Sequence, residues 1–133
     1  MADSTRRDER GTALSAMIAV LVVSLFAVVG LVVDGGAQSA ARARAASGAV
    51  EAARAAVDAG ATARASGAAP NVLAMVGEGR RALAERGLDG EVSVEAGVVH
   101  VHARTSAKTV FLSLIGIGEL AASGEAAAAL EDS

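Results

Sequence analysis

The sequence predicts an α+β protein, in which a long N-terminal transmembrane helix continues into an Ala-rich helix and then into a small head with an antiparallel β-sheet. Three observations lead to this fold class. An uncharged apolar stretch is followed by Ala-rich sequence without proline, and hydrophobic residues later alternate with polar ones. The expected segments are a basic leader-like segment over 1–11, a transmembrane helix over 12–34, an Ala-rich helix over 35–69 and a head domain over 70–133.

The apolar stretch runs from Gly11 to Val33 without a charged side chain. At about 1.5 Å of helical rise per residue, this length crosses the hydrocarbon layer with some tilt. Lipid offers no partner to backbone polar groups, so the segment should be a helix. Three arginines cluster just before it and Asp34 follows it, which favours a single-pass cell-membrane protein with a cytoplasmic N-terminus and the head outside.

A secretory signal peptide is a second interpretation of the same stretch. A basic start, an apolar run and the small residues Gly35-Gly36-Ala37 are its ingredients. It predicts a secreted soluble protein whose mature N-terminus lies near Gln38 or Ser39. The apolar run exceeds the roughly 7–15 residues usual for a signal core, which favours the retained anchor.

Composition limits how the region outside the membrane is stabilised. The chain is 53% hydrophobic, but much of this is Ala, with two Phe, no Trp, no Tyr and no Cys. A large core and disulfides are therefore excluded, and stability must come from the anchor or from oligomeric packing. The net charge of −3 argues against binding to a phosphate backbone, so we expect no nucleic-acid partner.

The segment from Ala37 to Ala69 has the composition of a helix, because Ala is the best helix former and opposite charges recur at helical spacing. Val50 and Val57 form a thin apolar line that would pack on a neighbouring helix through short Ala contacts. Two alternatives remain at Gly35-Gly36, a break or one continuous rod. The rod is our working interpretation.

The first element of the head should be a helix. Pro70 disfavours helical angles in the residue before it, and Asn71 is a good N-cap. Val72, Val76 and Leu83 then recur on one side, and Gly87 is placed as a stop. The predicted helix therefore ends near Arg86.

A β-hairpin should follow, because the hydrophobic period changes to two. A two-residue loop at Ala96-Gly97 sets Val94 opposite Val99 and Val92 opposite Val101 on one face. The other face then holds Ser93 opposite His100 and Glu91 opposite His102. Register and pattern agree, which makes this the strongest signal for a folded head.

The C-terminal part contains an apolar run over residues 110–117 that is too short for a second span. It predicts either a buried strand or a short helical turn that lays Phe111, Leu114 and Ile115 over the hairpin. From Glu119 to Ser133, propensity alone favours a helix.

His100 and His102 are the only histidines, and together with Glu91 they are the one candidate metal-ligand set. No third strong ligand is set by spacing, so a solvated face with a Glu91–His102 pair is the preferred interpretation and we expect no metal and no cofactor. The Gly-x-Gly elements lie outside any βαβ unit, and no Cys nucleophile or Ser/His/acid set is present. We therefore expect no enzymatic activity.

Two groups of residues are candidates for contacts at the membrane. Asp34, with Gly35 and Gly36, lies at the exit of the span, where its carboxylate is either solvated by headgroup water or in contact with basic residues of a neighbouring subunit. Small residues within the span allow close helix packing. These are Ser15, Ala16 and Ala19.

Several of these stretches together resemble a known family. They are Asp8-Glu9-Arg10-Gly11, the helix end Gly30-Leu31-Val32-Val33-Asp34-Gly35-Gly36, the Ala/Arg-rich run, and Thr109 to Ile117 between a hairpin and a small-residue tail. With these features the chain resembles the TadE/TadG-like Flp pilus-assembly proteins of high-GC bacteria. The resemblance covers nearly the whole chain, although its motifs are mostly hydrophobic and Ala-rich.

The resemblance implies a pilin-like fold and a structural role, as a subunit or an accessory (minor) pilin of a Flp/Tad-type pilus. Its implied partners are further copies or other pilins, the Tad secretion machinery, a prepilin peptidase and membrane lipid. The peptidase would cut after Gly11 and leave Thr12 as the new N-terminus. Pilins usually carry Glu at the fifth mature position, where this chain has Ala16. This departure points to an accessory or atypical subunit.

The resemblance also implies that the tail from Glu119 is a strand that completes the sheet, contrary to its propensity. A different class of function stays open beside the structural one. The chain would then be a monomeric, membrane-anchored extracellular binding module whose head folds and binds a ligand by itself.

Overall fold

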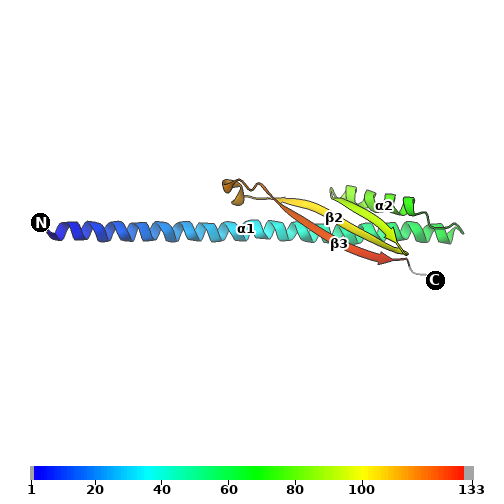
Figure 1. The fold of residues 1–133 in the computed structure, drawn as a ribbon, viewed down its shortest axis with the longest axis horizontal. Helices are drawn as coiled ribbons and strands as arrows, with labels where there is room; N and C mark the ends of the chain where they lie inside the picture. Colours follow the sequence, from blue (N-terminus) through cyan, green and yellow to red (C-terminus); the bar gives the residue numbers. More distant parts are fainter. Residues whose placement is uncertain (1, 131–133) are drawn as a thin grey trace.

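A single helix forms the axis of the molecule in the computed structural model, which describes residues 2–130 and the side chains of residues 9–130. Helix α1 (Ala2–Ala65) is 64 residues long. Figure 1 shows it as a straight rod, with the remaining elements gathered along its C-terminal half. It passes through Gly35 and Gly36 without a break. Residue 1, the side chains of the leader-like segment up to residue 8, and the tail beyond residue 130 lie outside the described part.

The head consists of one short helix and a three-stranded sheet beside α1. Helix α2 (Val72–Glu85) is followed by strands β1 (Asp89–Glu95), β2 (Val98–Lys108) and β3 (Glu119–Ala129). The strands are antiparallel and lie in the order β1-β2-β3. The predicted α+β class, long N-terminal helix and small antiparallel sheet are therefore confirmed.

Helix α2 begins where the capping signal predicts. The side chain of Asn71 accepts hydrogen bonds from the backbone N–H groups of Leu73 (2.9 Å) and Ala74 (3.4 Å). Its buried face matches the prediction at Leu83, which is buried, and at Val76, which packs against the core, but not at Val72, which is 50% exposed. The buried residues are Met75, Gly79 and Leu83. The absence of a side chain at Gly79 brings α2 close to the α1 backbone, since a Cβ there would lie 3.3 Å from the carbonyl oxygen of Ala52.

The hairpin has the predicted register. Val92 pairs with Val101 and Val94 with Val99, around a turn at Ala96 (φ 49°) and Gly97 (φ 79°). Positive φ at both turn residues is the geometry of a two-residue hairpin loop that matches strand twist. The buried valines of this hairpin, together with Met75, Leu83 and Leu88, are the bulky buried members of the core.

Strand β3 corrects the helix predicted from propensity and confirms the strand implied by the family resemblance. It pairs with β2 from Val98↔Ala129 to Lys108↔Glu119. Tertiary pairing outweighs helix propensity here, because the small side chains let the strand lie against α1. At Gly124 the approach is closest, since an added Cβ would lie 2.2 Å from the backbone nitrogen of Ala46.

The Ala-rich half of α1 forms one layer of the head. Its buried alanines are at most 1% exposed and lie on one side of the helix: Ala41, Ala45, Ala49, Ala52, Ala53 and Ala56. They pack against α2 and the sheet of the same chain. The Ala contacts predicted to form with a neighbouring helix are therefore made within one chain. Val50, which lies beside these alanines, is 41% exposed.

Candidate functional site

The N-terminal half of α1 projects beyond the head as a bare apolar rod (Figure 1). Every large hydrophobic side chain from Leu14 to Val33 is at least 43% exposed. In length and composition, α1 is sufficient to cross a membrane, and its apolar segment is almost entirely unburied. A surface this apolar and continuous requires a cover of lipid or protein.

The predicted processing and packing residues all lie on this bare part. Gly11 and Thr12 are within the regular helix, and the hydroxyl of Ser15 donates a hydrogen bond of 2.9 Å to the carbonyl oxygen of Gly11. Ala16 and Ala19 are exposed. The structure thus leaves these small side chains accessible to another helix.

Asp34 marks the boundary between the bare and the covered halves of α1. Its carboxylate accepts three backbone hydrogen bonds: Oδ1 from the N–H of Val110 (2.8 Å), and Oδ2 from the N–H groups of Phe111 (3.1 Å) and Leu112 (2.7 Å). The side chain is only 1% exposed. It is therefore held within its own chain, in neither of the two environments expected from the sequence, headgroup water or a neighbouring subunit.

This arrangement acts as a helix cap supplied from a distant part of the chain. Leu112–Ile115 form a short 3₁₀ helix, here η1, and the three donating N–H groups belong to its first residue and to the two residues before it. An ionised carboxylate carries only acceptors and so matches three converging donors. Asp34 thus fastens the loop between β2 and β3 to α1, at the end of the apolar segment.

Gly30 provides a second contact one helical turn before Asp34. The ring of Phe111 lies over it, because a Cβ at position 30 would be 2.5 Å from Cγ of Phe111. Residues four apart share a helix face, so Gly30 and Asp34 together form the seat of the loop. Gly35 and Gly36 do not take part, since both are exposed and a Cβ on either would meet nothing within 4 Å.

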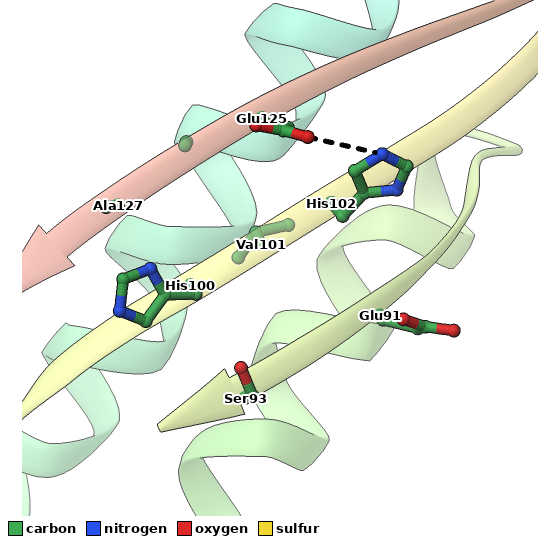
Figure 2. Close-up of a pocket in the computed structure, with 8 residues that line it drawn as sticks. Glu91, Ser93, His100, Val101, His102, Glu125 and Ala127 are labelled. Carbon is green, nitrogen blue, oxygen red and sulfur yellow. Dashed lines mark ion pairs between the residues drawn. The ribbon is translucent and has the colours of Figure 1, made fainter. Parts of the chain in front are cut away.

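The outer face of the sheet carries the histidines in a shallow depression of about 360 Å³ (Figure 2). His102 Nε2 lies 3.4 Å from Glu125 Oε1 on β3. The predicted Glu91–His102 pair is wrong, although their Cα atoms are partners, because Glu91 extends away and pairs with Arg104 at 3.4 Å. The carboxylate nearer to His102 is that of Glu125, because β3 pairs with the other edge of β2.

These ion pairs are exposed and contribute little to stability. Among the described residues, no group of three or more His, Cys, Asp or Glu side chains is placed to hold a metal ion. The depression therefore presents two imidazoles to solvent, one of them beside the carboxylate of Glu125.

Reasoning from the sequence found Asp34 but missed its partners. The donors are backbone N–H groups of residues 110–112, and no pattern of side chains in the sequence predicts them. Two signals were present: the run from Thr109 to Gly118 lacks any charge, and Gly30 interrupts an otherwise bulky helix one turn before an acidic residue. Together they indicate a loop seated on the end of the apolar helix.

Comparison with known proteins found no matching family, no similar curated protein and no similar solved structure.

Proposed function

We propose that the chain is a structural, pilin-like subunit or an accessory pilin of a Flp/Tad-type pilus. In this proposal residues 12–33 of α1 hold it in the cell membrane, with the N-terminus in the cytoplasm and the head outside. One observation carries the proposal. A single unbroken helix is apolar and exposed over residues 12–33, except at Gly30 beneath Phe111, and is buried along one side under its own head in its second half.

The bare half supplies both a membrane anchor and an assembly surface. Lipid covers it before assembly, and the helices of other subunits would replace lipid within a filament. Because the same helix is the backbone of the head, packing of the bare halves would set the position of every head. A flexible linker between anchor and head would not transmit this order.

The structure also narrows the assembly surface. The buried alanines between Ala41 and Ala56 are used inside the chain and are not available to a partner. Packing between copies would therefore use the bare half, where Ser15, Ala16 and Ala19 allow close approach. Ala16 in place of the usual pilin Glu removes the carboxylate that meets a neighbour's N-terminal amine, which supports an accessory subunit.

Electron microscopy of cells with and without the protein tests this proposal. Deletion should remove or shorten surface filaments, and the wild-type chain should restore them. Leu21→Glu places a charge in the bare half without touching the head and should fail to restore filaments. The matched variant Leu73→Glu changes a residue that is 82% exposed on α2 and should restore them. Unchanged filaments after deletion would contradict the proposal.

The mass of the mature chain distinguishes the processing alternatives. Cleavage after Gly11, cleavage near Ala37 and no cleavage give three different masses. Cleavage near Ala37 would cut α1 within its packed region. Ala37 packs against buried residues of the head, and Gln38 Nε2 donates a hydrogen bond of 3.2 Å to the carbonyl oxygen of Ala121. Cleavage there would also separate Asp34 from the loop. These contacts favour retention of the anchor over release as a secreted protein.

A membrane-anchored binding module is the second candidate, and one observation favours it. The head closes its core within a single chain and needs no second copy to bury its alanines. Under this alternative the protein stays monomeric in detergent or lipid and deletion leaves filaments unchanged. Crosslinking of the bare halves in membranes, through a single Cys introduced at Ala16, would exclude it.

A further inference from the structure

The loop between β2 and β3 exposes an apolar surface that the head does not use. Leu114 is 82% exposed and Ile115 73% exposed, and Val110 and Ile117 are also open. The sequence predicted either a buried strand or a short helical turn that lays these side chains over the hairpin. The strand is wrong, and the helical turn is present as η1 but does not cover the hairpin, because Leu114 and Ile115 stay exposed. Because Asp34 and Gly30 hold its start, the loop lies along α1 instead.

The position of the loop is alongside the bare apolar segment. Figure 1 shows it projecting past the end of the sheet toward the N-terminal half of α1. Loop and helix enclose an open apolar hollow of about 680 Å³, which Val23, Phe26 and Leu31 line on the helix side and Leu114 and Ile115 on the loop side. At 1.5 Å per residue, Val23 lies about 16 Å below Asp34 along the helix axis. The hollow is therefore at the depth of the uncharged stretch.

The backbone of the loop is largely satisfied from within the chain. Asp34 accepts from its first three N–H groups, and further bonds close the loop. These run from Leu114 N to Phe111 O, Gly116 N to Ser113 O, Ile117 N to Leu112 O and Thr109 N to Gly118 O. The hydroxyls of Ser113 and Thr109 donate to the carbonyl oxygens of Val110 and Ile117. Irregular backbone enters a bilayer only when its polar groups are paired in this way.

Charges bracket the loop at its two ends. Lys108 and Glu119 are exposed and mutually paired in the register of β2 and β3, and the residues between them carry no charge. On α1 the corresponding first charge is Asp34, which is buried beneath the loop. Charged residues thus begin on both segments near the same level, as they do where a protein crosses from hydrocarbon to headgroups.

We propose that residues 110–117 enter the outer leaflet of the membrane beside α1, and that lipid acyl chains occupy the hollow between them. Three features select hydrocarbon as the occupant: the loop and the bare helix form one continuous apolar surface, the loop backbone is paired, and charges flank the loop. The inference rests on the membrane placement of α1 in the proposed function but not on filament assembly. Its consequence is that the chain is held in the membrane at two points, α1 and the loop, which restricts rotation and tilt of the molecule relative to the bilayer.

Tryptophan fluorescence tests this directly, because the chain has no Trp and no Tyr. Leu114→Trp reports on the loop, and Leu73→Trp is its matched control, since both leucines are 82% exposed. Leu25→Trp reports on the bare helix. Each full-length variant is placed in nanodiscs that contain one chain and phospholipid with brominated acyl chains, and iodide is the quencher on the water side.

The expected result is that Leu114→Trp emits at shorter wavelength than Leu73→Trp, is quenched by brominated chains as Leu25→Trp is, and is protected from iodide. If Leu114→Trp emits and is quenched by iodide as Leu73→Trp is, while bromine still quenches Leu25→Trp, the placement of the loop in the membrane is overturned. The membrane placement of α1 would then still hold. A shift to shorter wavelength that appears only with several chains per disc, without bromine quenching, would assign the hollow to a second copy and also overturn it. Absence of bromine quenching at Leu25→Trp would overturn both membrane placements. Ile115→Trp repeats the measurement should Leu114→Trp disturb the loop.

Discussion

The carboxylate of Asp34 lies 2.7 Å from the backbone nitrogen of Leu112, although 78 residues separate them in the chain. Together with the bonds to Val110 and Phe111, this contact joins the end of the apolar segment to the loop between β2 and β3. A buried acceptor that serves three donors cannot be moved without leaving them unpaired. The position of this loop on α1 is therefore specified by one side chain.

Asp34→Asn should release the loop while the rest of the head stays folded. An amide offers one acceptor oxygen in place of two, and its NH₂ group would point donors at backbone N–H groups. We expect hydrogen exchange of the amides of residues 110–112 to accelerate by roughly tenfold or more, since local opening replaces a paired state. Hydrogen-exchange mass spectrometry of the full-length protein in detergent measures this.

The matched control is Asp58→Asn, which makes the same chemical change at an exposed position of the same helix. It should leave exchange of residues 110–112 at the wild-type rate. Equal protection in the two variants would show that the Asp34 contact does not hold the loop.

The sequence was informative wherever local pattern and tertiary structure agree. The alternation around Ala96-Gly97 predicted the hairpin register, and Asn71 predicted the start of α2, because each signal acts over a few residues. Propensity gave the wrong prediction for the tail from Glu119, because this segment pairs as a strand with the free edge of β2. The partners of Asp34 could not be found from pattern, since they are backbone groups brought together only by the complete fold.

Gly124→Ala should destabilise the head, because the new Cβ would lie 2.2 Å from a backbone atom of α1. Neither a strand nor a helix backbone can yield by a side-chain rotation, so β3 must move away from α1. We expect a loss of about 1–3 kcal/mol in the free energy of unfolding, as for other overpacked sites. Denaturant unfolding of the head, followed by circular dichroism, measures it.

Gly77→Ala is the control for Gly124→Ala. Its Cβ would meet nothing within 4 Å, and it replaces Gly by Ala within α2. It should stabilise the head by up to about 1 kcal/mol through helix propensity. If Gly124→Ala were equally stabilising, the close packing of β3 on α1 would be wrong.

Gly36→Pro should bend or break α1 between anchor and head. Proline removes a helical hydrogen bond and clashes with the preceding turn, at a cost of about 3 kcal/mol. Because the chain has no Cys, spin labels can be attached at single Cys residues introduced at Leu25 and Ala43. In the unbroken helix their backbones are about 27 Å apart along the axis. Gly36→Pro should broaden this distance distribution, whereas Gly36→Ala should leave it narrow; a broad distribution in the unsubstituted helix would contradict the continuous rod.

Ala49→Leu decides whether the Ala-rich face belongs to the head or to a bundle of helices. Ala49 is fully buried against the chain's own core, so a larger side chain should cost about 1–3 kcal/mol of head stability. Ala43→Leu makes the same change on the exposed side of the helix and should be nearly neutral, since Leu and Ala have similar helix propensities. Unfolding is measured by denaturant titration and association by crosslinking in membranes. If Ala49→Leu left the stability of the head unchanged and instead abolished association, the alanines would pack between chains. The expected result is the reverse, because the face that could have joined two helices is already covered by α2 and the sheet.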